Sequence, residues 1–503
     1  MIIIDGESLS IKELIKVARD GEKIKLKAQS SEKIKKSRKI VEEFVENNSI
    51  VYGVTTGFGK FSDTRISPRE VIHLQENLIK SHSAGTGDNL SLEIVRAMIL
   101  LRINALAKGY SGIRLKTINL LVDMLNNNIV PLVPEHGSVG ASGDLVPLAH
   151  MVLVMLGKGF ANVDGDILSG DKALNVKGLS PIKLKSKEGL ALINGTQMMS
   201  AHGAIAINDS LNLFFHVNYA LALSLEALKG ILSAFDENVH KLRPHPGQIK
   251  TARHIRTLVK GSKLALYERA DRVQDAYTLR CAPQVHGASY DAITHVQDIL
   301  IREINSVTDN PLIFPESKEV ISGGNFHGQP LALGMDYLAM AVSELGNISE
   351  RRIARLIDSS LNNGLEMFLT KYGGLNSGYM IAQYTAASLV AENKVLANPA
   401  SIDSIPTSAN QEDHVSMGSV SGRKLLKIIN NVEQIIAIEM LLATQAIDLR
   451  TDDPYEKLGI GSKKIYSEIR KIVEPLEEDR ILYPELYKVK ELIHKGDLKE
   501  KIE

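Results

Sequence analysis

Cysteine is almost absent from this 503-residue sequence, tryptophan is wholly absent, and neither sign of charge is in excess. The single cysteine, Cys281, excludes an intrachain disulfide framework and a zinc site built from several cysteines, and it fits a reducing compartment. Lys+Arg and Asp+Glu both total 59, so the basic excess that is typical of nucleic-acid-binding proteins is missing. We therefore expect a cytoplasmic location and no nucleic-acid partner.

Long apolar runs are also missing. The start, Met1–Asp5, lacks a basic segment followed by a sustained apolar one, so we expect no signal peptide. The stretch 211–228 is apolar almost all round, but it contains Asn212, His216 and Glu226, and a membrane-spanning helix needs roughly 20 mainly apolar residues. This stretch predicts a buried core helix, and we expect no membrane partner.

The periodicity of the chain is mainly helical. Apolar residues recur at intervals of three and four over 94–105, 331–345 and 425–435, as is typical of helices that pack against one another. Strand-like alternation is short and is found mainly over 2–4 and 182–184. The sequence therefore predicts a mostly α fold.

Glycine is concentrated in a few loops, most of them in the first part of the chain, at 52–59, 85–87 and 137–143. Backbone in such loops can take positive φ and approach a ligand closely. We expect a loop-rich N-terminal domain over 1–196 and a long-helix bundle over 197–503.

Several common catalytic motifs are excluded by inspection. In a P-loop, Val54 would have to be glycine and Phe61 would have to be serine or threonine. A nucleophile elbow would need glycine two positions after Ser142, where Asp144 stands. The zinc-protease motif His-Glu-x-x-His does not occur, and no ligand cluster stands out, so we expect no metal.

The segment Gly137-Ser-Val-Gly-Ala-Ser-Gly-Asp-Leu145 carries the most chemical information. One interpretation is an ordinary glycine-rich turn ahead of a helix, with Asp144 as its cap. The other is that these small residues fold tightly enough for the amide nitrogen of Gly143 to reach the carbonyl carbon of Ala141. Closing that ring and dehydrating Ser142 would make an electrophilic methylidene group from the chain itself.

This segment resembles the signature of the aromatic amino-acid ammonia-lyases, whose cofactor, 4-methylidene-imidazol-5-one (MIO), forms from Ala-Ser-Gly. Further blocks resemble the same family in matching order: Tyr52-Gly-Val-Thr-Thr-Gly-Phe-Gly59, Ser81-His82-Ser-Ala-Gly85, Asn194-Gly195-Thr196, Gln274-Asp-Ala-Tyr277-Thr-Leu-Arg280, Gly324-Asn-Phe326-His327 and Gln411-Glu412-Asp413-His414. The resemblance implies an enzyme that forms homotetramers, with active sites that draw residues from more than one subunit.

Within the family the chain looks most like the branch that acts on histidine. This implies elimination of ammonia from L-histidine to give trans-urocanate, the first step of histidine degradation. The cofactor would form autocatalytically from Ala141, Ser142 and Gly143, and its methylidene group would bond the substrate amine and improve its departure. Tyr52 resembles the general base, and Tyr277 would stabilise the cofactor environment or the carbanion-like state.

The resemblance also implies residues that hold the substrate carboxylate. Arg280 has a planar fork that suits two carboxylate oxygens, although an arginine here could equally form an ion pair with Asp271 or Asp275. Asn194 and Gln274 are amides that can donate and accept hydrogen bonds around the carboxylate and the cofactor ring.

Further residues would surround the substrate side chain. His82 can form a hydrogen bond with imidazole, and Glu412 can pair with it, whereas beside a phenyl ring a carboxylate would be buried unpaired at a cost of several kcal/mol. The phenylalanine and tyrosine enzymes usually have glutamine in place of Glu412. Met380 also resembles the histidine branch, and Phe326 would exclude water from the cofactor. Thr55 stands where the family more often has asparagine, which leaves the fit around that loop open.

Two other functions remain open at this point. The first is a phenylalanine or tyrosine ammonia-lyase or aminomutase, against which Glu412 and Met380 argue. The second is a helical binding protein that has lost activity, against which the intact 141–143 segment, Tyr52 and Arg280 argue. Turnover of the three amino acids would decide the first question, and the intact mass of the chain the second.

Overall fold

The computed structural model describes residues 1–47, 49–57, 59–61, 64, 66–67 and 70–502. Phe58, which belongs to the 52–59 block, therefore lies outside the described residues. Contacts between residues divide the chain into two units. The first unit comprises Met1–Asn208, Gln297–Asp336 and Pro399–Arg423, and the second comprises Asp209–Val296, Tyr337–Asn398 and Lys424–Glu503.

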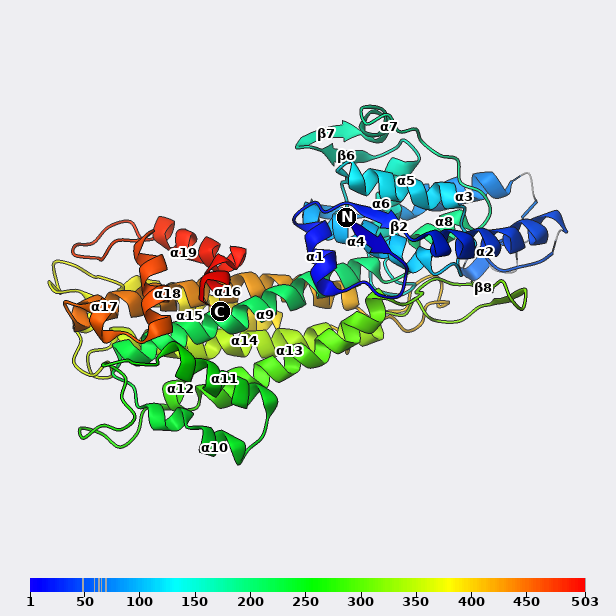
Figure 1. The fold of residues 1–503 in the computed structure, drawn as a ribbon. Coiled ribbons are helices and arrows are strands. Elements are labelled where there is room, and N and C mark those ends of the chain that lie inside the picture. Colours follow the sequence, from blue (N-terminus) through cyan, green and yellow to red (C-terminus); the bar gives the residue numbers. More distant parts are fainter. Residues whose placement is uncertain (48, 58, 62–63, 65, 68–69, 503) are drawn as a thin grey trace. The chain divides into compact units, whose positions relative to one another are not determined.

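The first unit combines helices with small sheets (Figure 1). Its helices are α1 (Ile11–Ala18), α2 (Ala28–Glu46), the 3-10 helix η1 (Gly59–Phe61), α3 (Val71–His82), α4 (Leu92–Ala107), α5 (Leu115–Asn126), α6 (Leu145–Met155), α7 (Gly170–Asn175) and α8 (Glu188–Ile193). Four long helices contain residues of both units: α9 (Gln197–Ala227), α13 (Ala282–Ile304), α14 (Gln329–Ile357) and α16 (Gly418–Arg450).

The strands are short, and all those in the described residues belong to the first unit. β1 (Ile2–Ile4) pairs in parallel with β2 (Ile24–Leu26). The other pairs are antiparallel: β3 (Thr86–Asn89) with β5 (Pro134–His136), β6 (Phe160–Val163) with both β4 (Ile129–Pro131) and β7 (Asp166–Ser169), and β8 (Leu312–Phe314) with β9 (Glu319–Ile321).

Helix α4 lies in the core of the first unit. Its residues from Ile94 to Ala107 are all buried, including Arg96 and Arg102. It is in contact with α1, α5 and α2. A helix that is apolar nearly all round is typical of such a central position.

The described residues of the second unit form helices and loops, with no strand among them. Besides its parts of the long helices, it contains η2 (Leu232–Phe235), α10 (Glu237–Lys241), α11 (Pro246–Leu258), α12 (Tyr277–Arg280), η3 (Met367–Leu369), α15 (Met380–Leu396), α17 (Pro454–Lys457), α18 (Ile460–Arg470), α19 (Tyr483–Lys495) and α20 (Asp497–Ile502).

Buried polar bonds join the long helices within the second unit. The Glu439 carboxylate of α16 pairs with Arg352 of α14 and accepts hydrogen bonds from Ser224 of α9 and Ser349 of α14. Because both charged groups are fully buried, removing either partner alone would leave an uncompensated charge.

The mostly α fold expected from the sequence is confirmed. The three periodic stretches lie in α4, α14 and α16, and 211–228 falls almost wholly within α9, where most of its side chains are buried. No helix in the described part of the chain has the length and apolar character needed to cross a bilayer.

Two expectations from the sequence concern the segment 182–184 and the division into domains. Residues 182–184 do not form a strand; Ile182 and Leu184 are buried, but the segment joins no sheet and Ile182 N donates to Met155 O. The contacts group 197–208, 297–336 and 399–423 with the first unit. In the last of these segments, Met417 N donates to Val139 O of the 137–144 loop. The division into domains at Thr196 stays a prediction.

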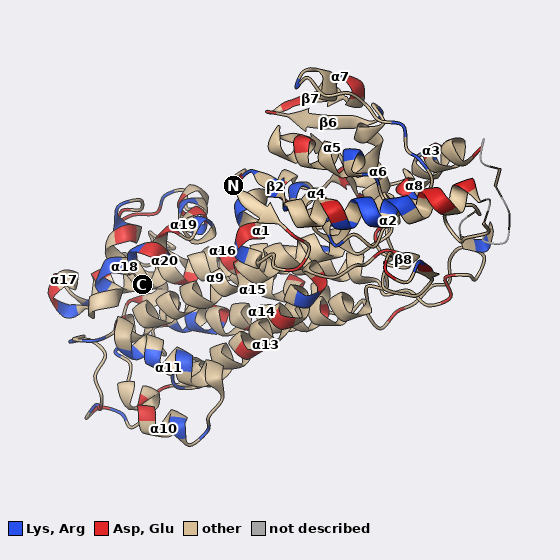
Figure 2. Ribbon diagram, turned by 45° about the vertical axis from the view of Figure 1, so that its right-hand side comes forward, with Lys and Arg blue, Asp and Glu red and all other residues tan. Residues whose placement is uncertain are grey.

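The basic residues of the lysine-rich helix α2 lie between acidic residues on either side (Figure 2). Lys35 pairs with Glu32, and Arg38 with Glu42. This arrangement is typical of a solvated helix face and presents no purely basic surface.

Candidate active site

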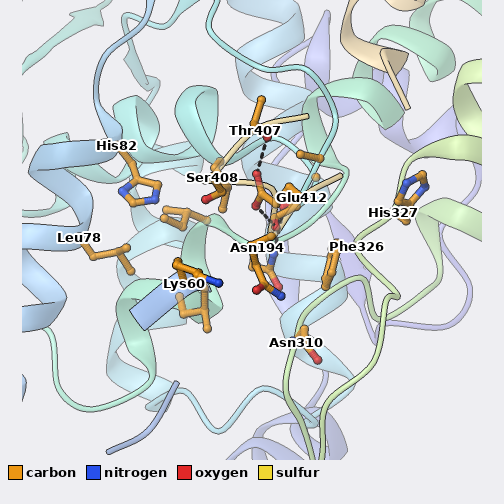
Figure 3. Close-up of a pocket in the computed structure, with 18 of the residues that line it drawn as sticks. Lys60, Leu78, His82, Asn194, Asn310, Phe326, His327, Thr407, Ser408 and Glu412 are labelled. Carbon is orange, nitrogen blue, oxygen red and sulfur yellow. Dashed lines mark hydrogen bonds between the residues drawn. The ribbon is translucent and has the colours of Figure 1, made fainter. Parts of the chain in front are cut away.

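A cavity of about 1190 Å³ lies in the first unit, and Figure 3 shows part of its lining. Its walls come from the loops around 50–61, 137–146, 310–327 and 407–414, together with residues of α3 and the end of α8. The cavity brings together many of the site residues predicted from the sequence: Tyr52, His82, Ala141, Ser142, Gly143, Asn194, Phe326 and Glu412.

The 137–144 loop is held tightly at two glycines. Gly140 and Gly143 have φ of +68° and +69°, a region that favours glycine. A Cβ on Gly143 would lie 2.2 Å from Gly195 O, and one on Gly140 would lie 2.2 Å from Ser416 Oγ. Asp144 N donates to Gly195 O at 2.7 Å. The loop therefore has no room for a side chain at either Gly140 or Gly143.

Ser142 points into the cavity and has polar partners on both its side chain and its backbone. Its Oγ donates to Glu412 Oε1 at 2.7 Å, and its carbonyl oxygen accepts from Asn194 Nδ2 at 2.9 Å. Glu412 Oε2 accepts from Thr407 Oγ1 at 2.9 Å, and the dashed lines in Figure 3 mark these bonds around Glu412. The serine of the Ala-Ser-Gly sequence is thus in direct contact with a carboxylate.

A short hairpin holds Glu412 in place. Thr407 N donates to Glu412 O at 3.0 Å, and Glu412 N donates to Thr407 O at 3.3 Å. The turn between them has positive φ at Ser408, Ala409 and Asn410, three consecutive residues that are not glycine. Such backbone strain is often found where surrounding structure holds a functional residue.

Asp144 closes the loop and is fully buried. Burial raises the pKa of its carboxyl to about 7, although the amides of Met199 and Met198 and the hydroxyl of Ser138 oppose this shift. Its Oδ2 accepts from Met199 N at 2.9 Å, and its Oδ1 accepts from Ser138 Oγ at 3.0 Å. Asp144 does not cap α6 with its side chain, as the turn interpretation expected, but binds an amide in the first turn of α9.

Tyr52 is half-buried at the edge of the cavity, in the loop that also contains Thr55. Gly59 N donates to Tyr52 Oη at 3.3 Å. Thr55 Oγ1 donates to Ser49 O at 2.6 Å and accepts from Val51 N at 3.0 Å, so a hydroxyl is sufficient to close this turn.

His82 is the last residue of α3 and lies across the cavity from Asn194 in Figure 3. Burial lowers the pKa of its imidazole, while the Leu78 carbonyl and the negative charge of Glu412 raise it. Because burial is the largest of these effects, His82 is neutral at neutral pH.

The family model of the aromatic amino acid lyases matches residues 9–471. The chain belongs to the aromatic amino acid lyase family. A protein of Natranaerobius thermophilus named histidine ammonia-lyase is 56% identical over 503 residues, which cover 100% of this chain and 99% of that protein. The solved structure of histidine ammonia-lyase from Trypanosoma cruzi is 44% identical, with a TM-score of 0.93, and the match covers 100% of this chain and 94% of that one.

Enzymes that catalyse different reactions share the aromatic amino acid lyase fold. A tyrosine aminomutase from Streptomyces globisporus is 37% identical to this chain, with a TM-score of 0.95 and coverage of 100% of this chain and 98% of that one. The fold therefore does not select the substrate, and the side chains of the cavity must be considered for that purpose.

Other residues that line the cavity were not predicted from the sequence as site residues. They are Lys60, Asn310, His327, Thr407, Ser408 and His414, among others. The rings of His327 and His414 are parallel, with centroids 5.8 Å apart. Both histidines lie in blocks that resemble the family, so the motifs marked their segments; Thr407 had no such signal, because its bond to Glu412 arises from the hairpin.

The remaining predicted residues belong to the second unit and are not in the lining of this cavity: Gln274, Tyr277, Arg280 and Met380. Tyr277 is 69% exposed, and the guanidinium of Arg280 lies 4.5 Å from the centroid of its ring. Within the described residues Arg280 forms no salt bridge, because Asp275 pairs with Arg272 instead. The ion pair that the sequence left open for Arg280 is therefore not formed.

No group of three or more His, Cys, Asp or Glu side chains in the described residues is placed to hold a metal ion. Cys281, at the end of α12, is a free thiol.

Proposed function

We propose that this protein is a histidine ammonia-lyase, which eliminates ammonia from L-histidine to give trans-urocanate. The observation that carries the proposal is the contact between Glu412 and Ser142, which puts a carboxylate beside the Ala-Ser-Gly segment in a cavity that His82 also lines. The name of the Natranaerobius relative, whose sequence matches over the full chain, supports the same substrate.

The residues present fit the MIO group of the resemblance. Gly143 cannot accept a Cβ, Ala141 is small and buried, and Asn194 holds the Ser142 carbonyl. The group would form from these three consecutive residues, 141–143, and would supply an electrophilic methylidene carbon for the substrate amine. Formation needs no external cofactor, only the loss of water from the loop.

Glu412 and His82 give the cavity its preference for imidazole. The carboxylate can accept an imidazole N–H or pair with imidazolium, and a neutral His82 can accept or donate one hydrogen bond. Dehydration of Ser142 removes the hydroxyl that now donates to Glu412 Oε1, so this oxygen becomes available to the substrate. A phenyl side chain would leave the carboxylate without a partner, which disfavours phenylalanine.

Tyr52 is the proposed general base, because its hydroxyl faces the same cavity as Ser142 and accepts a hydrogen bond from Gly59 N. Asn194 would orient the substrate beside the loop, and Phe326 would exclude water.

The second unit supplies the remaining proposed groups. Arg280 would bind the substrate carboxylate, with Gln274 beside it, while Tyr277 and Met380 would complete the site. Tyr277 is exposed, its ring lies against the Arg280 guanidinium, and Arg280 forms no salt bridge in the described chain, which supports these roles. We propose a homotetramer in which subunits share each active site, located in the cytoplasm.

The proposal is tested with Ser142→Ala. Alanine cannot lose a hydroxyl, so this variant should keep the full mass of its sequence and lose nearly all histidine turnover, while its circular dichroism stays unchanged. Wild-type chain should be lighter than its sequence by the lost water, as measured by intact mass spectrometry. A matched control is Ser317→Ala, an exposed serine in the turn between β8 and β9, which should behave as wild type.

Turnover of L-histidine, L-phenylalanine and L-tyrosine by the wild-type chain separates the candidate reactions. We expect urocanate from histidine and little product from the other two. A preference for tyrosine or phenylalanine would contradict the roles given to Glu412 and His82, and an unmodified serine in active wild-type enzyme would overturn the proposed chemistry.

A further inference from the structure

Arg102 is a fully buried arginine in α4 of the first unit. Its Nη1 donates to Asn194 O at 2.6 Å and to Gln197 Oε1 at 2.9 Å. Its Nε and Nη2 have no hydrogen-bond partner among the described residues. Burial lowers the pKa of Arg102 to about 10, so the group stays protonated at neutral pH. All the hydrogen bonds of this buried cation therefore come from one nitrogen.

The carbonyl that Arg102 binds belongs to the turn behind the Ala-Ser-Gly loop. Asn194 Nδ2 donates to Ser142 O at 2.9 Å, and Gly195 O accepts from Asp144 N at 2.7 Å. A Cβ on Gly195 would lie 2.6 Å from Arg102 Nη1, so the guanidinium lies directly against this turn. Arg102 therefore contacts the two residues, Asn194 and Gly195, that form hydrogen bonds with Ser142 and Asp144.

Neighbouring charged groups have partners of their own. Lys187 Nζ pairs with Asp309 Oδ2 at 2.8 Å, and both side chains are fully buried. Glu303 Oε1 accepts from Thr196 Oγ1 at 2.5 Å. Among the described residues, Arg102 forms no salt bridge. The negative charge of Asp309 raises its pKa against the effect of burial, but the hydrogen bonds of Arg102 go to the neutral oxygens of Asn194 and Gln197.

We propose that Arg102 is a positioning residue for the self-modification of the 141–143 segment, acting through Asn194 and Gly195. This rests on the proposed function, because it concerns the same loop. A bond forms between Gly143 N and the Ala141 carbonyl carbon. The carbonyl oxygen leaves as water with the amide hydrogens of Gly143 and Ser142, and a double bond forms between the Ala141 carbonyl carbon and Ser142 N. Ser142 then loses its Oγ and its Cα hydrogen as a second water. No oxidant or reductant is needed.

Ring closure requires the chain to be held bent before the reaction, since fixing reacting atoms in place is a large part of the rate of an intramolecular reaction. Side chains that hold a reactive segment depend in turn on buried partners for their own geometry. Charged hydrogen bonds are stronger than neutral ones, so the bond from Arg102 fixes the Asn194–Gly195 turn more firmly than a neutral donor would. This turn packs against the 142–144 segment and holds it in its bent conformation.

The experiment compares Arg102→Gln and Arg102→Lys with matched changes at Arg96. Arg96 is a second buried arginine of α4, but it binds Val17 O and Asn128 Oδ1, away from the loop. Each full-length chain is purified promptly after low-temperature expression and then incubated. Intact mass reports the dehydrated fraction with time, and circular dichroism and thermal unfolding report the fold.

We expect Arg102→Gln to dehydrate roughly tenfold to a hundredfold more slowly than wild type, as for loss of one charged hydrogen bond. Arg102→Lys, which keeps the charge but has a shorter reach, should be intermediate. Arg96→Gln and Arg96→Lys should lose thermal stability yet dehydrate at the wild-type rate. Dehydration is the readout that a merely structural arginine would leave unchanged.

Three results would overturn the inference. The first is a folded Arg102→Gln chain that dehydrates as fast as wild type. The second is equal slowing in the Arg96 variants, which would mean a general effect of stability. The third is failure of both Arg102 variants to fold while the Arg96 variants fold, which would make Arg102 a structural residue only. Failure of the proposed function is distinguishable from all three, because wild-type chain itself would then remain undehydrated or fail to convert histidine.

Discussion

Glu412 is the proposed specificity residue, and it is in direct contact with Ser142 of the Ala-Ser-Gly segment. Both of its oxygens have donors in the structure, Ser142 Oγ on one and Thr407 Oγ1 on the other. It is half-buried and faces the cavity, unlike a solvated acid on a surface loop. A carboxylate held by a hairpin on one side and by the reactive serine on the other is well placed to receive imidazole.

We expect Glu412→Gln to lower kcat/KM for L-histidine by roughly tenfold to a hundredfold, because glutamine keeps the size but loses the charge that pairs with imidazole. Steady-state kinetics of urocanate formation measure this change. Intact mass must confirm that the variant is dehydrated as wild type is.

The control for this prediction is Asp403→Asn, which removes a charge from an exposed acid that precedes the hairpin and does not line the cavity. It should change kcat/KM far less. Equal efficiency of Glu412→Gln and wild type would remove Glu412 from the substrate site.

At the scale of elements, Asp144 joins the starts of two helices. It precedes α6 in the chain, and its carboxylate binds the amide of Met199 in the first turn of α9. The positive end of the α9 dipole favours the anion there, yet burial outweighs this effect and raises the pKa of Asp144 to about 7.

The raised pKa predicts how stability changes with pH. Between about pH 4 and pH 7 the folded chain holds a proton on Asp144 that the unfolded chain has released. The contribution of this group to the free energy of unfolding therefore falls as pH rises through that interval, by on the order of 4 kcal/mol, and is constant above it.

Asp144→Asn removes the titration. The difference in thermal midpoint between wild type and this variant should be most favourable to wild type at pH 5 and should decrease toward pH 8. Asp166→Asn, an exposed acid of β7, should give a difference that does not vary over this range. A difference that grows with pH would contradict the pKa of Asp144.

At the scale of the whole molecule, the proposed site residues are divided between the two units. The first unit contributes the cavity with Ser142, Tyr52 and Glu412, and the second contributes Arg280 and Tyr277. The proposed tetramer would complete each cavity with residues of other subunits, as the resemblance implies.

Complementation between two inactive variants tests whether the subunits share active sites. Ser142→Ala and Arg280→Ala should each be inactive alone, but co-expressed chains carrying different tags should form mixed tetramers with roughly a quarter of wild-type activity if subunits mix at random. The mixed species are isolated by both tags and their size is measured by sedimentation. Ser142→Ala mixed with Tyr52→Phe should recover nothing, since both residues line one cavity. Inactive mixed tetramers of the first pair would place Ser142 and Arg280 in a site of the same chain.

The sequence by itself was sufficient for the family and the helical class, and it predicted 141–143 as the segment that forms the cofactor. These depend on local order: apolar periodicity predicts helices such as α4 and α16, and small residues in a row permit the tight loop. The order of the motifs also marked His82 and Glu412 as site residues.

Only the tertiary structure decided which of these residues meet. Ser142 and Glu412 are 270 positions apart, and their bond depends on the packing of loops that no local pattern encodes. The same reason explains the hairpin at Thr407, the buried contact of Arg102 with Asn194, and the absence of a strand at 182–184, whose apolar residues are buried without sheet partners. Periodicity along a chain indicates which face of an element is buried, but the partner on that face is selected by three-dimensional packing.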